Sequence, residues 1–257
     1  MAETLLFRPP AAPPPVPEGW RTGPPDFVGV GTIRSGTTWW HYLIDCHPDV
    51  ASPSGRPKEV HFFDQFRARR SGPEPDAYHA YFPRPVGARC GEWTPRYMFD
   101  EWTPPLLARS APDARLLVLL RDPVERMSSA LTYIRDLGGP LDAEMVNREF
   151  VRSLYWSQLS RLNRCFPRDR ILVLQYERCV ADLPGELTRT FTFLGLDPAG
   201  LRLTAHHGRP RNATASTKVP VDRDVPASTL ATFRDELRRL AVDYPEVDQS
   251  LWPSAGL

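Results

Sequence analysis

The 257-residue sequence predicts an α/β fold, a three-layer domain in which a central parallel sheet is flanked by helices. Two observations carry this prediction. Apolar runs such as residues 116–120 are continuous rather than alternating, which is typical of strands buried on both faces. These runs alternate with helical patterns, which is typical of parallel sheets. Because ligands bind such sheets at the carboxyl ends of the strands, the residues after each run are the first candidates for a site.

The elements are expected in a regular order along the chain. They are a strand ending at Gly31, a helix over 39–45, a strand over 116–120, a helix from Pro123 to about Leu137, a strand over 171–174, and helices near 184–194 and 227–243. Apolar residues at helical spacing predict a further stripe that faces the core. The residues of this stripe are Val151, Tyr155, Leu159, Leu162 and Phe166.

Residues 1–25 are expected to form a proline-rich N-terminal arm, and residues 26–257 a single domain. Eight prolines between positions 9 and 25 exclude a helix or an inner strand there. An arm that lies on the domain and a disordered arm both fit this composition. The rest of the chain has enough apolar residues to bury a core, since 41% of the whole sequence is hydrophobic.

The composition limits which binding partners and which cellular compartment are expected. A net charge of +1 provides no field that would attract nucleic acid or an anionic membrane. The cysteines (Cys46, Cys90, Cys165 and Cys179) form neither a CxxC pair nor a zinc-like cluster, so we expect no metal and a reducing compartment. The first residues lack a signal-peptide pattern, and no apolar stretch is long enough to span a membrane. A cytoplasmic protein is expected, and the oligomeric state is left open.

A glycine-containing loop follows the first strand. Residues 31–38 read GTIRSGTT and lead into a helix, so successive backbone N–H groups and the helix dipole predict an anion site. The residues expected to bind are Arg34, Ser35, Gly36, Thr37 and Thr38. The GxxxxG spacing is P-loop-like, but Thr37 stands where a Walker loop has lysine, and the cation is Arg34. The loop is therefore predicted to bind a phosphate-like group other than a triphosphate.

Glu59 is a candidate general base. A helix and a short strand are expected to return it to the same end of the sheet as the glycine loop. Phe62 and Phe63 are expected to desolvate its carboxylate and so to raise its pKa. A pairing with Arg56 or Lys58 would instead make it a structural carboxylate, and His61 is the competing base.

Arg121 and Ser129 are candidates for a second phosphate site. Arg121 follows the run over 116–120, and Ser129 lies about two turns inside the next helix. They can bracket one phosphate if the strand end and the helix pack side by side. Asp122, between them, is expected to cap the helix.

Taken in this order, the motifs resemble those of the sulfotransferases that use 3′-phosphoadenosine-5′-phosphosulfate (PAPS). The branch concerned includes the heparan sulfate sulfotransferases and their bacterial relatives. The similar segments, which cover nearly the whole folded chain, are Ile33–Thr38, His47–Val50, Glu59–Asp64, Glu92–Tyr97, Leu120–Ser129, Arg152–Tyr155 and Phe166-Pro167.

The resemblance implies transfer of a sulfuryl group from PAPS, with PAP as product and no metal. The acceptor group would be a hydroxyl, or an amine, of a small molecule or sugar. It also implies the roles of the residues. Loop 34–38 would bind the 5′-phosphosulfate, Arg121 and Ser129 the 3′-phosphate, and Arg211 and Lys218 are candidates for a late loop over that phosphate. Glu59 would be the base, His61 would support it, and Arg34 would stabilise charge on the bridging oxygen.

The sequence departs from the family pattern at two positions where the family has a lysine. Arg34 stands where many members have lysine, and Trp93 replaces the lysine of the family's Glu-Lys-Thr-Pro stretch. The second change removes a cation expected near the sulfuryl group.

Two alternatives remain at this point. A P-loop nucleotide kinase or NTPase is disfavoured by the missing Walker lysine, and a non-catalytic nucleotide-binding module is disfavoured by Glu59. The acceptor is expected to be a small alcohol, phenol or sugar, as in secondary metabolism. Residues 64–85 are either part of the acceptor wall or a solvated loop.

Overall fold

The computed structural model describes residues 10–67, 72–208, 216–221 and 227–256. These residues form a four-stranded, wholly parallel sheet with the strand order β2-β1-β3-β4. The strands are β1 (Phe27–Gly31), β2 (Gly91–Trp93), β3 (Arg115–Leu120) and β4 (Ile171–Gln175). The predicted α/β class with a central parallel sheet is confirmed.

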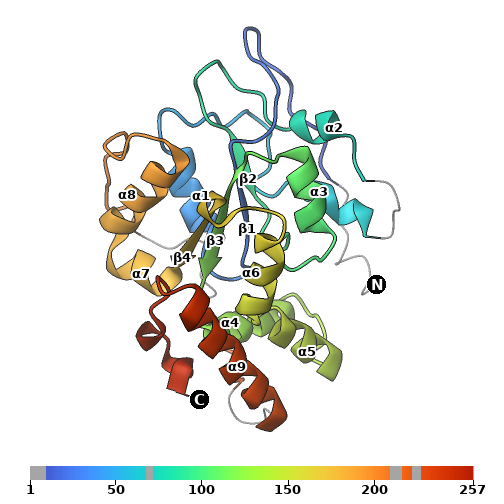
Figure 1. Ribbon diagram of the computed structural model, residues 1–257, viewed down its shortest axis with the longest axis vertical. Helices are drawn as coiled ribbons and strands as arrows, with labels where there is room; N and C mark the ends of the chain where they lie inside the picture. The colour runs from blue at the N-terminus through green and yellow to red at the C-terminus, as the bar shows by residue number, and fades with distance from the viewer. Residues whose placement is uncertain (1–9, 68–71, 209–215, 222–226, 257) are drawn as a thin grey trace.

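Side chains of the strands alternate between two hydrophobic cores. One core lies between the sheet and the helices α3 (Thr103–Ser110), α6 (Tyr155–Asn163) and α9 (Ala227–Asp243). The other lies between the sheet and α1 (Thr37–Asp45), α7 (Tyr176–Ala181) and α8 (Leu183–Leu194). Figure 1 shows α1 and α8 on one side of the sheet and α3 and α6 on the other. Because both faces are covered, the strands are continuous apolar runs.

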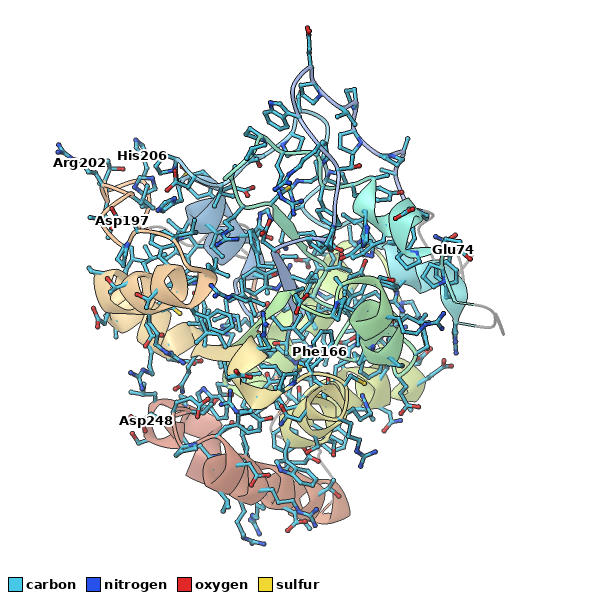
Figure 2. The ribbon with its side chains drawn as sticks, turned by 45° about the horizontal axis from the view of Figure 1, so that its top comes forward. Glu74, Phe166, Asp197, Arg202, His206 and Asp248 are labelled. Carbon is cyan, nitrogen blue, oxygen red and sulfur yellow. The ribbon has the colours of Figure 1, made fainter. Side chains whose placement is uncertain are left out.

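The remaining elements border the sheet. Helices α4 (Pro123–Asp136) and α5 (Ala143–Val151) lie beyond the carboxyl ends of the strands, towards which the strands run downwards in Figure 1. The short elements are η2 (Phe62–Phe66), α2 (Pro75–His79), η3 (Arg168–Arg170), η4 (Gln249–Leu251) and η5 (Pro253–Gly256). Figure 2 shows Phe166 in the interior, whereas Asp197, Arg202 and His206 project at the periphery.

The predicted continuous stripe from Val151 to Phe166 is wrong at its first residue. Helix α5 ends at Val151, which is 38% exposed, and α6 begins at Tyr155. The turn between them is held by Ser153, whose hydroxyl accepts a hydrogen bond from the buried Arg126 at 2.8 Å. The stripe from Tyr155 to Phe166 is buried as predicted.

Strand β2 and the segment before Glu59 also differ from the prediction. No strand lies between α1 and Glu59 in this described part of the chain. The strand at that edge is instead β2, with Gly91 opposite Phe27 and Trp93 opposite Gly29. Three residues with a glutamate in the middle carry no apolar run, so the sequence pattern could not reveal this strand.

The described part of the N-terminal arm, residues 10–25, lies against the domain. The Tyr81 hydroxyl donates to the Ala11 carbonyl at 2.6 Å, and Arg21 forms an antiparallel bridge with Arg84. The division of the chain at residue 26 stays a prediction. Among the described helices, none combines the length and the apolar character needed to cross a bilayer.

Candidate active site

The loop between β1 and α1 is fixed in place before any ligand binds. The Thr32 hydroxyl donates to the Leu119 carbonyl of β3 at 3.0 Å and lies 2.5 Å from the Ser35 hydroxyl. Helix α1 begins immediately afterwards at Thr37, where its first N–H groups have no partner within the helix. The predicted anion-binding geometry, a tight loop at a helix N-terminus, is therefore present.

Two residues of this loop have a left-handed backbone. Gly36 has φ +89°, and a side chain there would meet the Tyr176 ring at 2.8 Å, so glycine is needed on both counts. Arg34 has φ +67°, which is uncommon for a residue with a side chain. Residues held in such conformations cluster at ligand clamps and active sites.

Lys58 joins the glycine loop to the segment of the candidate base. Its ammonium group donates to the Thr37 hydroxyl at 3.1 Å, to the Thr38 hydroxyl at 3.3 Å and to Glu59 Oε1 at 2.9 Å. Burial lowers the pKa of Lys58, and the negative charges of Glu59 and Glu92, which raise it, offset this only in part. The sequence reasoning treated Lys58 only as a possible structural partner. A signal was available, because Lys58 and Lys218 are the only lysines of the chain and Lys58 directly precedes Glu59.

Glu59 lies between two cations. Besides Lys58, its Oε2 atom lies 3.2 Å from His61 Nε2. Burial would raise the pKa of Glu59, but the hydrogen bond from His61 and the charge of Lys58 outweigh burial and lower it. The predicted rise is therefore wrong, because the two cationic neighbours outweigh burial. Phe62 and Phe63 themselves pack into the core against Tyr78.

His61 bridges two carboxylates. Its Nδ1 atom lies 3.0 Å from Asp64 Oδ2, opposite the contact with Glu59, and Asp64 lies 3.6 Å from Arg96 Nη1. Burial would lower the pKa of His61, but the hydrogen bonds to Asp64 and Glu59 raise it to about 9. Near pH 7 the ring is therefore an imidazolium that donates from both nitrogens. A ring in this state has no site for an incoming proton, which favours Glu59 over His61 as a base.

The segment Glu92–Tyr97 holds the base segment in position. Buried Glu92 accepts from the Val60 amide at 3.0 Å and from the Thr94 and Tyr78 hydroxyls at 2.5 and 2.7 Å. The Trp93 amide donates to the Lys58 carbonyl at 2.9 Å, and the Tyr97 hydroxyl accepts from the Phe62 amide at 2.8 Å. One backbone hydrogen bond and the side chains of Glu92 and Tyr97 thus hold the segment that carries Lys58 and Glu59 against β2 and its continuation.

Trp93 is part of the sheet and does not point into the site. It is fully buried, and its indole N–H donates to the Gly31 carbonyl at 3.1 Å. Its ring occupies the space above Gly29, where an added Cβ would lie 2.0 Å away. The side chain that replaces the family lysine therefore supplies packing, and the cation nearest to the base is Lys58.

Arg34, Arg121 and Ser129 come together at the other side of the loop. Arg34 Nε donates to the Ser129 hydroxyl at 3.3 Å, and its guanidinium lies 4.7 Å from the centre of the Tyr133 ring. Arg121 Nη1 donates to the Arg34 carbonyl at 3.4 Å. The end of β3 and the second turn of α4 thus pack side by side, as the bracketing of one phosphate requires.

Lys218 reaches the same place from the late part of the chain. It forms an ion pair with Glu125, and Glu125 also pairs with Arg121 at 3.2 Å. The carbonyl of the neighbouring Val219 accepts from the Ser128 hydroxyl at 2.6 Å, and the Val219 amide donates to the Thr132 hydroxyl at 2.9 Å. Residues 217–219 therefore lie along α4 beside Ser129. Arg211 lies outside the described residues.

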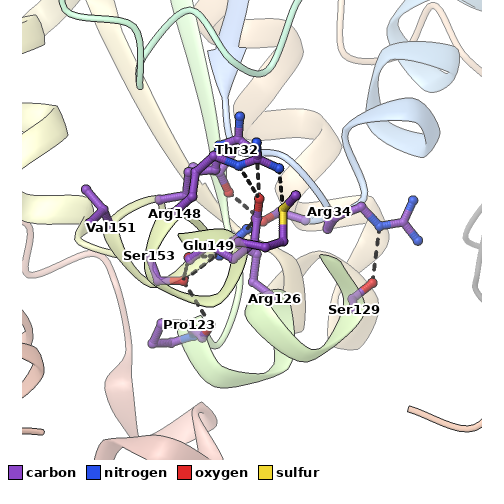
Figure 3. Close-up of polar contacts among 12 residues, drawn as sticks. Thr32, Arg34, Pro123, Arg126, Ser129, Arg148, Glu149, Val151 and Ser153 are labelled. Atoms are coloured by element: carbon purple, nitrogen blue, oxygen red, sulfur yellow. Dashed lines mark hydrogen bonds and ion pairs between the residues drawn. The ribbon is translucent and has the colours of Figure 1, made fainter. Parts of the chain in front are cut away.

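A buried ion pair joins helix α4 to α5. Asp122 caps its N-terminus as predicted, accepting from the Val124 and Glu125 amides at 2.9 Å. Arg126, which is fully buried, lies 3.2 Å from Glu149 of α5, and Figure 3 shows these contacts beside the Arg34–Ser129 pair. Removing one partner of a buried ion pair is costly, so α4 is held firmly against α5.

At its aromatic residues the segment over 64–85 is neither an acceptor wall nor a solvated loop, and its residues 68–71 lie outside the described part of the chain. Tyr78, Tyr81 and Phe82 are 0%, 4% and 0% exposed and belong to the hydrophobic core. They therefore offer no surface to an acceptor. The described residues contain no group of three or more side chains suited to a metal ion.

Comparisons with known proteins bear on this site. Residues 24–217 match the family described as "Sulfotransferase domain". Heparan sulfate glucosamine 3-O-sulfotransferase 6 of Mus musculus is 31% identical over 211 residues, covering 75% of this chain and 58% of that protein. Membrane-associated sulfotransferase kil1 of Dictyostelium discoideum is 35% identical over 105 residues, covering 41% of this chain and 22% of that protein. The chain thus spans less than two thirds of the length of these relatives.

Solved structures show the same fold. A sulfotransferase from Alicyclobacillus acidocaldarius superposes with a TM-score of 0.66 at 21% identity, covering 88% of this chain and 98% of that one. The sulfotransferase domain of the Synechococcus PCC 7002 olefin synthase gives 0.54 at 15% identity, covering 86% and 97%. Since the family match extends over most of the sequence, from the strand before the glycine loop to the residue before Lys218, the chain belongs to the sulfotransferase domain family.

Proposed function

We propose that this chain transfers a sulfuryl group from PAPS to a hydroxyl or amine of a small-molecule or sugar acceptor, with Glu59 as the general base. The observation that carries the proposal is Lys58, whose ammonium group contacts both the loop threonines and Glu59. It places a cation and a carboxylate together at the start of α1, where an anionic donor would bind. Membership of the sulfotransferase family argues against the nucleotide kinase or NTPase.

The donor's phosphate groups have two sets of candidate partners. The N–H groups at the start of α1, with Ser35, Thr37 and Thr38, suit the 5′-phosphosulfate. Arg121 and Ser129 suit the 3′-phosphate, and Lys218 lies next to them through Glu125. Arg34 spans the gap between the two sets and can stabilise charge on the bridging oxygen.

The reaction is a displacement at sulfur. The acceptor oxygen forms a bond to sulfur while its proton passes to a carboxylate oxygen of Glu59. The bond between sulfur and the bridging oxygen breaks, and its electrons stay with PAP. Each turnover begins with Glu59 ionised. His61, which Asp64 holds in place, stabilises that ionised form.

Lys58 has a double role in this proposal. While it pairs with Glu59, it keeps the carboxylate ionised but weakly basic. A sulfate-like anion beside Thr37 and Thr38 attracts the same ammonium group, which loosens its pair with Glu59. The base therefore strengthens when the donor is bound, which suits general-base catalysis.

The experiment that tests the function is a screen of acceptors with radiolabelled PAPS. Alcohols, phenols and sugars form one arm of the screen and amines another, and release of PAP is measured in parallel with product label. We expect labelled product with at least one class. Binding of PAP without transfer to any acceptor would instead support the non-catalytic nucleotide-binding module. A cytoplasmic location remains part of the proposal.

A further inference from the structure

A second cationic pocket lies at the opposite end of the sheet from the candidate active site. It has a volume of about 440 Å³ and is bordered by the segments that lead into the four strands. Five residues of β1 at about 3.3 Å each put roughly 16 Å between this end and the glycine loop. In Figure 1 the strands begin at the upper end of the sheet. Parallel sheets bind their ligands at the carboxyl ends of strands, so this pocket needs an explanation of its own.

Arginines dominate the lining of the pocket. They are Arg84 and Arg89 before β2, Arg109 near the end of α3, Arg115 at the start of β3 and Arg170 before β4. The carboxylates of the lining are Asp26 and Asp113, which leaves a surplus of three positive charges in a chain whose net charge is +1. Arginine stays protonated in proteins, so the cluster cannot relieve its repulsion by losing protons.

The existing ion pairs do not neutralise this cluster. Arg84 and Arg89 share a single carboxylate, Asp26, at 3.0 and 3.1 Å. Arg170 lies 3.6 Å from Asp113, but the Asp113 side chain is 91% exposed, so water screens that attraction strongly. Arg115 Nη1 is buried and has no hydrogen-bond partner among the described residues.

The guanidinium group of Arg115 lies close enough to those of Arg89 and Arg170 to be repelled by both. Burial lowers the pKa of Arg115, and the charges of Arg89 and Arg170 lower it further. Gly195, which ends α8 with φ +68°, makes room for two of them, because an added Cβ would meet Arg115 Nη1 at 2.8 Å and Arg89 Nη2 at 3.5 Å. A bound anion would remove the repulsion that this packing creates.

We propose that this pocket binds a small oxyanion with at least two sulfate or phosphate groups, held mainly by Arg89, Arg115 and Arg170. Planar guanidinium groups bind such groups through paired N–H donors, and the surplus of charge matches a multivalent ligand. The pocket shares no residue with the candidate active site. Its occupancy is therefore independent of sulfuryl transfer and can be tested apart from it.

The test is calorimetric titration of the PAP-saturated protein, in which the donor site is already filled. Inorganic pyrophosphate is the probe in one arm and a disulfated disaccharide in the other, which separates phosphate from sulfate ligands. We expect saturable binding of at least one probe. If the PAP-saturated protein binds neither probe at concentrations up to about 10 mM, the proposal is overturned. This holds also if the protein without PAP binds them, because the probes then occupy the donor site.

The variant Arg115→Gln/Arg170→Gln should weaken binding at least 10-fold, the scale of one lost charge-assisted hydrogen bond. The matched control is Arg238→Gln/Arg239→Gln, which removes two exposed arginines of α9 that pair with Asp235. An equal loss in the control means a non-specific charge effect and overturns the site. Should the pocket variant fail to fold, the single variant Arg170→Gln provides a separate test, because it removes one of the three guanidinium groups from a side chain that is 37% exposed, and it should weaken binding about 3-fold. Unchanged or tighter binding in that variant contradicts the proposal.

Discussion

At the scale of single residues, the ionisation of Glu59 is set by its two cationic neighbours. Lys58 and His61 contact different oxygens of the carboxylate, at 2.9 and 3.2 Å. Their combined effect exceeds that of burial, so the pKa of Glu59 is lowered. A base of this kind is ionised over a wide pH range, and its strength depends on how firmly the neighbours hold it.

The first prediction compares the two candidate bases. Glu59→Gln keeps the size of the side chain but cannot take up the acceptor's proton, so single-turnover transfer should fall roughly 10²–10⁴-fold. His61→Asn should cost less, because His61 is already protonated with a pKa of about 9. Both variants should bind PAP like the unmodified protein. If Glu59→Gln keeps its rate while His61→Asn is inactive, the roles are reversed.

The second prediction concerns Lys58 and the pH dependence of the rate. The charge of Lys58 lowers the pKa of Glu59, so Lys58→Met should raise that pKa. Activity requires the ionised carboxylate, and the acid limb of the kcat/KM profile, which reports the free enzyme, should therefore move to higher pH. Lys58→Arg should restore much of the original profile.

A binding measurement separates this role from a loss of folding. Lys58→Met should raise the KM for PAPS about 10-fold, the scale of one charge-assisted hydrogen bond, and change the Kd for PAP little, since PAP lacks the sulfuryl group. An acid limb that stays in place while the KM rises would show that Lys58 acts on the donor alone.

At the scale of elements, the site depends on how β3 meets α4. Arg121 directly follows the strand and Ser129 lies on the helix, and the Arg126–Glu149 pair fixes α4 against α5. Both residues lie outside the glycine loop, and the contact of each with that loop is made through Arg34. Contacts to the 3′-phosphate should therefore be separable by mutation from contacts to the 5′-phosphosulfate.

The third prediction tests that separation. Arg121→Ala should weaken PAP binding by about 1.5–3 kcal/mol, the range for hydrogen bonds to charged groups. Adenosine 5′-phosphosulfate lacks the 3′-phosphate, so its binding should change much less. Calorimetric titration of both ligands measures the difference. Equal losses for the two would remove Arg121 from the 3′-phosphate site.

At the scale of the whole molecule, the donor should stabilise the fold. At about 100 times its Kd, PAP should add roughly 2.7 kcal/mol to the free energy of unfolding. This fourth prediction is checked by thermal unfolding with and without PAP. ATP with Mg²⁺ is the control, because Thr37 stands where a Walker loop has its lysine. A rise in the melting temperature with ATP and Mg²⁺ but none with PAP would contradict the proposed donor.

Much of this fold could be predicted from the sequence because its central strands are buried on both faces. The runs ending at Gly31, Leu120 and Gln175 are continuous and apolar, and each was found within one or two residues. Strand β2 could not be found in this way. Its identity depends on backbone pairing with β1, and Glu92 at its centre is buried through hydrogen bonds rather than through apolar character.

The candidate site was predictable where neighbours in sequence are neighbours in space. The glycine loop and the cap at Asp122 are local features, so the sequence located them. The contact of Lys58 with Thr37 and Thr38 spans about 20 residues and depends on β2. The direction of the pKa shift of Glu59 could not be predicted for the same reason, because only the fold shows that Lys58 and His61 both contact its carboxylate.

The contact between Gly29 and Trp93 constrains the routes by which this sequence can evolve. Any side chain at position 29 would overlap the indole ring, since its first carbon would lie 2.0 Å from the ring. The two positions are therefore epistatic, and Gly29 becomes free to vary only after Trp93 has been replaced by a smaller residue. Lineages that keep the tryptophan should consequently keep the glycine with it, and the two positions should covary.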